Sequence, residues 1–426
     1  MGIIHKALKV RIYPTQKQQE VLNKTLGSCR ALYNMMLFER IQTYDAWKAS
    51  GDDVRVLYEH EYKTEKQYKE EYEWLKDSVD SQALQQSRIN LSMAYQNFFK
   101  SLKGQRKGTK SGFPKFKKKR TGSSYRTMMT NNNIAIDFEK HKVKLPKVGY
   151  VNFKDLRTKI EGVIKSATVS RSSTGKYFVS FLIEQELILN GVEIADELKA
   201  KTIGLDMSLE KLFVDNEGNS PAYERLYRKY EPLLKKAQRK MSKKKKGSKN
   251  WYKALHKVNL IHELITNKRK DFTHKLSTEL VKNNEVIVVE HLSLKGMSQA
   301  LHLGKSVMDL GYSEFVRQLS YKSLWNNKTF IQADKWFASS KTCSICGYKN
   351  KDLQLSDRDW KCLNCGTDHD RDQNAGVNLK NYGLKELGLV PEGLGEYKPV
   401  ESKTSVSTSV ELSLDAEAGR SPVFSG

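Results

Sequence analysis

The sequence has no long apolar run, few cysteines and comparatively few acidic residues. No apolar segment approaches the roughly 20 residues that a membrane-spanning helix needs, and the first twelve residues lack the apolar stretch of a signal peptide. Only five of the 426 residues are cysteines, and four of these form two CxxC pairs, which favours a reducing cytosol and a metal site over a disulfide framework. We therefore expect a cytoplasmic protein without a membrane partner.

Basic residues far outnumber acidic ones. There are 74 Lys and Arg against 49 Asp and Glu, a formal net charge of +25. Such an excess exceeds what solubility requires and indicates a polyanionic partner, most simply nucleic acid. Residues 100–126 and 235–257 each hold eleven basic residues and no acidic one. A charge run is usually a solvated face, but beside Trp251 and Tyr252 we favour phosphate contact for the second stretch.

The first half of the chain combines a strand, a helical block and several short strands. Leu8–Tyr13 alternates apolar and polar residues, as a half-buried strand does, and Thr15 with Gln18 forms a capping box that starts a helix. Strand-like segments joined by tight turns follow the basic loop. We predict a small wedge-like β-barrel with a helical insertion. The barrel would comprise residues 1–13 and 125–190, and the insertion with its basic loop residues 14–124.

Two CxxC pairs indicate a metal site in the second half. The pairs are separated by fifteen residues, which lies within the range of zinc ribbons. Gly347 and Gly366, one residue after each pair, allow the backbone to fold back around the ion. Four protein ligands close a tetrahedral zinc site, so the zinc would be structural; a redox dithiol and plain core cysteines are the alternatives. The predicted ligands of a ribbon over residues 338–366 are Cys343, Cys346, Cys362 and Cys365.

Three carboxylates lie at places where strands end or helices begin. Asp206 follows an apolar strand that opens a hairpin, Glu290 ends a second buried strand, and Asp372 begins a helix near the C-terminal end. Individually each is more often a turn or cap residue. In an RNase H-like sheet, however, these three places converge on one edge, where the acids could bridge two Mg²⁺ ions. We predict a nuclease domain of residues 198–337 and 367–392, and a disordered tail from 393 to 426.

The ordered motifs around these residues resemble the TnpB family, encoded by bacterial and archaeal insertion sequences, and its relatives, the compact type V CRISPR effectors. The resemblance covers nearly the whole chain. Its motifs are KALKVRIYPTQKQQEVLNKTLGSCRALYN, GFPKFKKKR, KLPKVGYVNF, IGLDMSLEKLFVDNEG, NKRKDFTHKLST, IVVEHLSLKGM, WFASSKTCSICG and CGTDHDRDQNAGVNL.

The resemblance implies a multidomain α+β protein. A wedge-like barrel with an inserted helical recognition domain would be followed by an RNase H-like RuvC domain that contains the zinc ribbon. The family's catalytic, magnesium-binding acids fall on Asp206 in GLDMS, Glu290 in IVVEHL and Asp372 in HDRDQNA. Members use an RNA from the element's end as a guide, recognise a short motif beside the target and cut double-stranded DNA. The expected partners are therefore a guide RNA and double-stranded DNA in a prokaryotic cytoplasm.

Seven basic side chains are candidate phosphate contacts, although each could be ordinary surface charge. They lie on the first strand and in the basic loop, and are Lys9, Arg11, Lys115, Lys117, Lys118, Lys119 and Arg120.

Two departures from the family pattern stand beside the acids. Ser208 replaces a common glycine, and NAGVNL, with Gly376, replaces the commoner NAA-x-NI, which we interpret as a mild change. Some relatives that lack the acids act as RNA-guided repressors; this chain keeps all three. The function predicted is RNA-guided DNA cleavage by two-metal hydrolysis. The alternatives are a non-cleaving RNA-guided regulator and a transposase that performs strand transfer.

Overall fold

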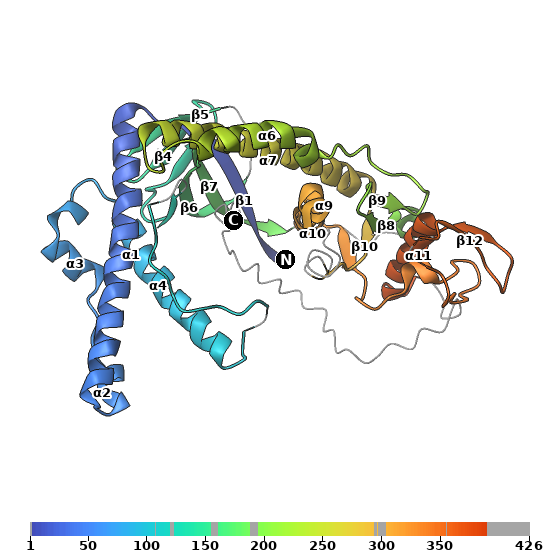
Figure 1. Ribbon diagram of the computed structural model, residues 1–426, viewed down its shortest axis with the longest axis horizontal. Helices are drawn as coiled ribbons and strands as arrows, with labels where there is room; N and C mark the ends of the chain where they lie inside the picture. Colours follow the sequence, from blue (N-terminus) through green and yellow to red (C-terminus); the bar gives the residue numbers. More distant parts are fainter. Residues whose placement is uncertain are drawn as a thin grey trace. The chain divides into compact units, whose positions relative to one another are not determined.

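The computed structural model describes residues 2–106, 108–119, 123–154, 161–187, 195–293, 296, 304–354 and 356–389. These residues form two compact units, one within Ile3–Glu186 and one that begins at Leu187 (Figure 1). Arg120 and the predicted disordered tail lie outside the described residues.

A seven-stranded sheet forms the centre of the N-terminal unit. Its strand order is β2-β6-β7-β1-β5-β4-β3, and the β1–β5, β2–β6, β3–β4, β4–β5 and β6–β7 pairs are antiparallel. The strands are β1 (Gly2–Tyr13), β2 (Ser123–Met128), β3 (Ala135–Asp137), β4 (Lys142–Leu145), β5 (Gly149–Phe153), β6 (Val163–Arg171) and β7 (Tyr177–Leu187).

The predicted barrel is not confirmed. Within the described residues, no pairing joins the two edge strands β2 and β3, so the sheet is open there. The strand β2 begins at Ser123, two residues before residue 125, where the predicted barrel segment starts. Tyr125 and Thr127 of β2 point into the core of the unit and are almost fully buried. This is the period of two typical of a strand, which the neighbouring basic residues obscured in the sequence.

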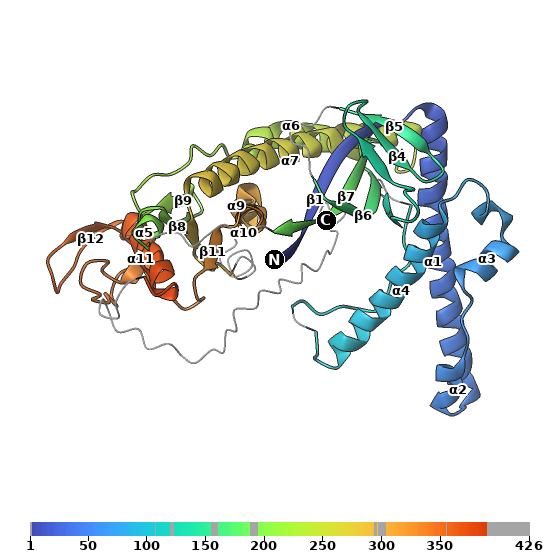
Figure 2. The same ribbon diagram turned by 180° about the vertical axis from the view of Figure 1, so that it is seen from behind.

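Helices pack beside this sheet, with α1 and α4 in contact (Figure 2). The capping box predicted at Thr15 is present, since its side chain accepts from the backbone of Gln18 while Gln18 bonds back to Thr15. Cys29 of α1 is buried in the hydrophobic core of this unit. The helices are α1 (Gln16–Ser50), α2 (Val54–Glu59), α3 (Glu65–Glu71), η1 (Glu73–Leu75) and α4 (Ser81–Leu102).

The C-terminal unit is built on a mixed four-stranded sheet with the order β11-β10-β8-β9. β8 and β9 form an antiparallel hairpin, whereas β10 runs parallel to both β8 and β11. This is the arrangement of a first strand followed by a hairpin and a later buried strand that the sequence predicts. The strands are β8 (Thr202–Ser208), β9 (Leu212–Asp215), β10 (Val286–Val289) and β11 (Thr329–Gln332).

Helices cover both faces of this sheet. Leu205 of β8 and Ile287 of β10 pack against α7 and α10 on one face, while Val286 and Val288 pack with Leu379 of α11 on the other. The helices of this unit are α5 (Ala195–Ala200), α6 (Leu226–Ser242), α7 (Lys249–Asn283), α9 (Gly304–Leu310), α10 (Tyr312–Trp325), η2 (Ser339–Lys341) and α11 (Arg371–Glu386). A small hairpin of β12 (Asp359–Lys361) and β13 (Asp368–Asp370) precedes α11. No helix among the described residues is long and apolar enough to cross a lipid bilayer.

Three glycines bring α11 unusually close to the sheet. A Cβ atom on Gly204 would lie 2.1 Å from the carbonyl oxygen of Gly376 and 2.5 Å from the backbone nitrogen of Lys380. A Cβ on Gly376 would lie 2.7 Å from the backbone of Asp215, and one on Gly383 would lie 2.3 Å from a methyl group of Val288. Gly376, predicted to be a mild departure, is therefore a contact point where no larger side chain fits without backbone movement.

We expect Gly204→Ala to destabilise the C-terminal unit by about 3 kcal/mol or more, because the added methyl group meets backbone atoms that cannot rotate away. Gly27→Ala is the matched control: it lies in α1 with nothing near its Cβ position, and alanine should stabilise that helix by up to about 1 kcal/mol. Thermal unfolding and amide hydrogen exchange in α11 measure both effects. Wild-type exchange in Gly204→Ala would contradict the packing described.

Candidate functional site

Two of the predicted acids lie side by side on the face of the sheet that α11 covers. In the parallel pairing of β8 with β10, Leu205 is opposite Val289, so the next residues, Asp206 and Glu290, are neighbours. Leu205 and Val289 both pack into the core of the α7–α10 face. Because side chains alternate along a strand, Asp206 projects to the opposite face, where α11 lies. Glu290 directly follows β10, and its charge acts on Asp206.

The third acid reaches the same place from the start of α11. Asp370, not Asp372, is the N-cap: its carboxylate accepts the backbone N–H of Gln373 at 2.8 Å. The possibility that Asp372 serves as the helix cap is therefore wrong, since a neighbouring aspartate already does so. Asp372 lies in the first turn, where the positive end of the helix dipole favours a carboxylate.

Burial and mutual repulsion raise the pKa of Asp206 well above its usual range. Desolvation is the largest cause, followed by the charges of Glu290 and Asp372, while Arg371 and Arg358 act in the opposite direction. Desolvation also raises the pKa of Glu290, against a hydrogen bond from the backbone N–H of Met207. The structure thus brings all three acids within electrostatic range of one another, in a setting where a bound cation would relieve their repulsion.

Neighbouring groups orient the acids. The Tyr312 hydroxyl at the start of α10 donates to the Glu290 carbonyl oxygen at 2.9 Å, which fixes the backbone where β10 ends. Arg358, just before β12, forms an ion pair with Asp372 at 3.3 Å. Sequence patterns did not single out these two residues, because their partners lie 22 and 14 positions away along the chain.

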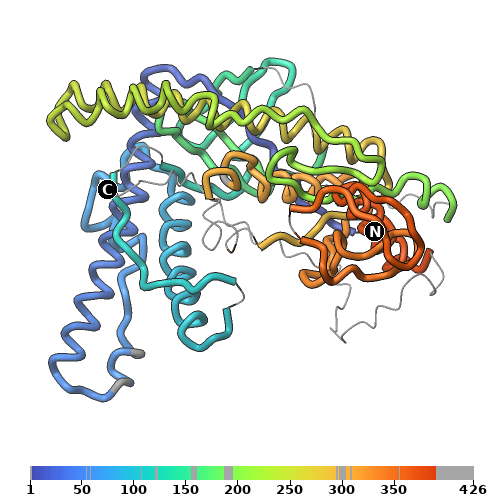
Figure 3. The backbone as a smooth tube through the Cα atoms, turned by 45° about the vertical axis from the view of Figure 1, so that its right-hand side comes forward, coloured from blue at the N-terminus to red at the C-terminus, as the bar shows by residue number. Residues whose placement is uncertain are grey.

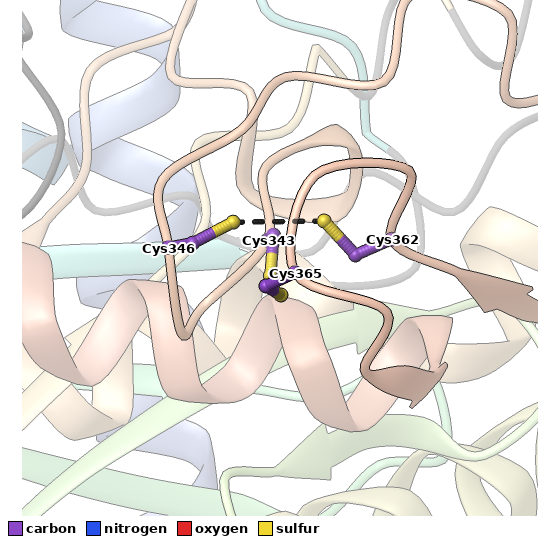
Figure 4. A group of neighbouring side chains, drawn as sticks. All are labelled: Cys343, Cys346, Cys362 and Cys365. Atoms are coloured by element: carbon purple, nitrogen blue, oxygen red, sulfur yellow. Dashed lines mark hydrogen bonds between the residues drawn. The ribbon is translucent and has the colours of Figure 1, made fainter.

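The four cysteines form the most compact ligand group in the described part of the chain. Their sulfur atoms all lie within 4.8 Å of one another, and Figure 4 shows them converging from two loops. The Sγ atoms of Cys343 and Cys365 are 3.7 Å apart, and those of Cys346 and Cys362 are 3.6 Å apart. Four thiolates about 2.3 Å from a tetrahedral zinc would be about 3.8 Å apart, so the group could hold a structural zinc ion. The three acids do not form an equally compact group.

Both CxxC turns have the same backbone construction. Gly347 donates to the carbonyl of Cys343 at 2.9 Å, and Gly366 donates to that of Cys362 at 2.8 Å. Both glycines have φ of 75°, the left-handed conformation that a tight turn requires here. The prediction that these glycines let the chain fold back is therefore confirmed. His369 of β13, which sequence patterns did not single out, adds a contact of 3.0 Å between its Nε2 atom and the sulfur of Cys343.

Two buried asparagines attach the cysteine segment to the helix that carries Asp372. Asn374 donates to the carbonyl of Thr342 at 2.8 Å and accepts the backbone N–H of Ser344 at 3.0 Å. Asn378, one turn later, donates to the carbonyls of Ser339 and Thr342 at 2.7 and 2.6 Å. The only sequence signal for them is polar residues on the inner face of a helix. They couple the metal-ligand loop to the first turns of α11.

The predicted phosphate contacts lie on the N-terminal unit and are mostly exposed. Lys9 and Arg11 lie on the outer face of β1, over the rings of Phe178 and Tyr13 respectively. Lys117 differs, because its ammonium group is 4.0 Å from the Tyr33 ring centre and desolvation lowers its pKa. Lys115, Lys118 and Lys119 are exposed. A role for any of them in phosphate contact stays a prediction.

The raised pKa of Asp206 predicts a pH-dependent stability. The folded state holds the Asp206 proton more tightly than the unfolded chain does, so protonation of Asp206 stabilises the folded state. This contribution is fully present below the unfolded-state pKa of about 3.9, and it is lost as pH rises through the higher folded-state pKa. In a chelator at neutral pH, Asp206→Asn should therefore raise the free energy of unfolding by about 1.4 kcal/mol per unit of pKa elevation, and the gain should shrink toward pH 4. Thermal unfolding at the two pH values measures it. Asp271→Asn, at an exposed ion pair with Lys275, is the control and should change little. An equal gain at both pH values would contradict the prediction.

Family models match three segments of the chain. The OrfB_IS605 model, described as "Probable transposase", matches residues 182–301 and so includes Asp206 and Glu290. A "Cas12f1-like, TNB domain" model matches residues 312–379, which contain the four cysteines and Asp372. A "Helix-turn-helix domain" model matches residues 1–48, which the structure forms as β1 and most of α1.

Relatives that match nearly the whole chain are named as RNA-guided DNA endonucleases. Proteins of Streptomyces pristinaespiralis (33% identical, covering 90% of each chain) and Escherichia coli K12 (30% identical, covering 89% of this chain and 92% of the relative) are both named "Putative RNA-guided DNA endonuclease". A "TnpB-like protein" of Acanthamoeba polyphaga mimivirus is 34% identical over 29% of this chain and 24% of its own. The Cas12f1 chain in a complex with sgRNA and target DNA has a TM-score of 0.49 and 15% identity, over 89% of this chain and 99% of that one. With two relatives of at least 30% identity over nine tenths of its length, the chain belongs to the OrfB_IS605, or TnpB, family.

Proposed function

We propose that this protein is an RNA-guided endonuclease that cleaves double-stranded DNA at the acidic edge formed by Asp206, Glu290 and Asp372. The observation that carries the proposal is the convergence of the three acids from β8, β10 and α11 on one face of the sheet. The names of two full-length relatives support it. The segments that hold the acids constitute the RuvC domain of our proposal, with the cysteine ribbon between Glu290 and Asp372.

The acids supply what a divalent cation requires. Oxygen ligands from carboxylates suit Mg²⁺, and the repulsion that raises the pKa of Asp206 makes a bound cation favourable there. Two such ions, when bound, would activate a water molecule against the scissile phosphate and stabilise the leaving 3′ oxygen. Asp206 is in β8 and Glu290 directly follows β10, so the pairing of Leu205 with Val289 brings their backbones close together. Asp372 is on a helix whose position depends on the glycine contacts.

The partners in this proposal are a guide RNA from the end of the insertion sequence and a DNA target beside a short recognition motif. A net charge of +25 supports a polyanionic partner of this kind. The wedge-like and recognition roles of the N-terminal unit, and phosphate contact by its exposed lysines, belong to the same proposal.

Cleavage should depend on Asp206 whereas binding should not. Asp206→Ala is expected to abolish cleavage of a matched plasmid in Mg²⁺ while affinity for RNA and target stays near the wild-type value, because the side chain contacts the proposed metals rather than the nucleic acid bases. Cleavage assays and filter binding on the same purified complex measure the two quantities. Loss of both would show that Asp206 has a structural role.

The same assay separates the alternative functions. A wild-type complex that binds its target but leaves the plasmid intact in Mg²⁺ would be a non-cleaving regulator. Joined element ends formed without RNA would indicate strand transfer by a transposase. We do not expect the regulator, because all three acids are present and converge; strand transfer would use the same acids and is separated from hydrolysis by the RNA requirement and the product.

We further propose that the four cysteines bind one structural zinc ion, and that the ribbon positions Asp372. Purified protein should contain one zinc per chain, and Cys362→Ser should lose it, since three thiolates leave the tetrahedral site incomplete. Hydrogen exchange should then increase in the first turns of α11, because Asn374 and Asn378 bond to the cysteine segment. Cys29→Ser, in the other unit, is the control and should keep the zinc. Zinc loss without faster exchange in α11 would contradict the coupling.

A further inference from the structure

The helical hairpin of α6 and α7 carries a dense group of cations. Figure 3 follows the chain along α6, through a tight turn at Lys243–Ser248 and back along α7. We call the stretch from Lys235 to Lys257 the basic prong. Its eleven basic residues are all exposed, and no acidic residue occurs between Pro232 and His262. Within the prong, all of which the structure describes, an ion pair is formed only by Lys235, with Glu231.

So many like charges in one place repel one another, and no acidic residue lies within the prong to offset them. Surface lysines elsewhere on the chain commonly pair with a carboxylate three or four residues away, as Lys275 does with Asp271 and Lys201 with Glu197. Apart from Lys235, the basic residues of the prong lack such stabilising ion pairs. A binding partner with a high density of negative charge would remove this repulsion by neutralising the ammonium groups.

Aromatic residues at the tip identify the kind of polyanion. Trp251 and Tyr252 lie in the first turn of α7, next to the four lysines of the turn, and their rings are 5.2 Å apart. The Tyr252 side chain is 57% exposed, unlike the tyrosines that pack into the two cores. An exposed aromatic ring among cations is a platform on which unpaired bases stack, whereas a closed duplex offers its bases to no such ring.

The base of the prong is anchored firmly. The buried carboxylate of Asp309, in α9, accepts the backbone N–H groups of Tyr227 and Arg228 at 2.7 and 3.4 Å, and so caps α6 from outside. Arg269 of α7 pairs with the same carboxylate at 3.7 Å. Both helices are therefore tied to one buried charge. With 35 residues, α7 is about 52 Å long, so its first turn lies far from this anchor.

From these observations we infer that the basic prong binds an unpaired loop of RNA, with its lysines on the phosphates and Tyr252 stacked on a base. This inference rests on the proposed function in that RNA is the natural partner of such a protein. It goes further by assigning RNA-loop binding to a surface that contains none of the three acids. The prong would hold RNA before any target is present. In a variant with a damaged prong, cleavage would fail only because the RNA is lost.

The test uses the full-length protein and the RNA that copurifies with it, in the absence of DNA. Changing Lys243–Lys246 to Gln should weaken RNA binding about tenfold or more and reduce the slope of log affinity against log salt by about 3, since each phosphate contact on a single strand contributes roughly 0.7. A control with the same charge change, at lysines that already pair with carboxylates, should keep the wild-type affinity and slope. The control lysines are Lys63, Lys199, Lys229 and Lys275.

Tyr252→Ala tests the stacking separately from the charge. It should lower affinity for an RNA hairpin with a large unpaired loop by about tenfold, and leave affinity for a fully paired RNA duplex unchanged. Equal loss on both RNAs, or wild-type affinity in both the lysine and the tyrosine variants, would overturn the inference. Weakened binding of duplex DNA with RNA binding intact would show that the prong serves the DNA instead. Failure of the wild-type protein to bind any RNA would refute the proposed function itself, and is thereby distinguished from failure of the prong.

Discussion

The close approach of α11 to the sheet is the constraint on which the candidate site depends. Gly204, Gly376 and Gly383 leave no room for a Cβ atom, so the helix backbone rests directly on β8, β9 and β10. Two acids are fixed by strand register, but the third is placed only by this contact. A helix held away from the sheet by even one methyl group would carry Asp372 away from Asp206. Packing and chemistry are therefore set by the same three residues.

The cysteine segment extends that constraint rather than standing apart from it. Asn374 and Asn378 bond its backbone to α11, Arg358 reaches Asp372, and β13 runs directly into the N-cap at Asp370. Because buried amide groups are costly when their hydrogen bonds are lost, these bonds hold the loop and the helix as one body. A zinc site folded into such a loop would contribute to the position of a carboxylate it never touches.

The grouping of acids at the edge of the sheet lowers the stability of the folded protein when no cation is bound. Asp206 is largely buried beside two other acids, and its raised pKa reports that the folded protein tolerates its charge poorly. The basic prong shows the same feature with the opposite sign: its cations are exposed, and only Lys235 pairs with a carboxylate. In both places charge of one sign is concentrated where packing alone would disperse it, which is the expected mark of sites that are completed by a ligand.

The sequence by itself determined what is encoded locally. The CxxC pairs with their following glycines, the Thr15 capping box and the alternation in β1 were all readable because each depends on residues a few positions apart. The three acids were identifiable only through the ordered motifs around them. Tertiary structure decided the rest: the open sheet where a barrel was predicted, and the asparagine bonds between ribbon and helix. These depend on contacts between residues far apart in the chain, and no local pattern specifies which backbone a glycine will meet.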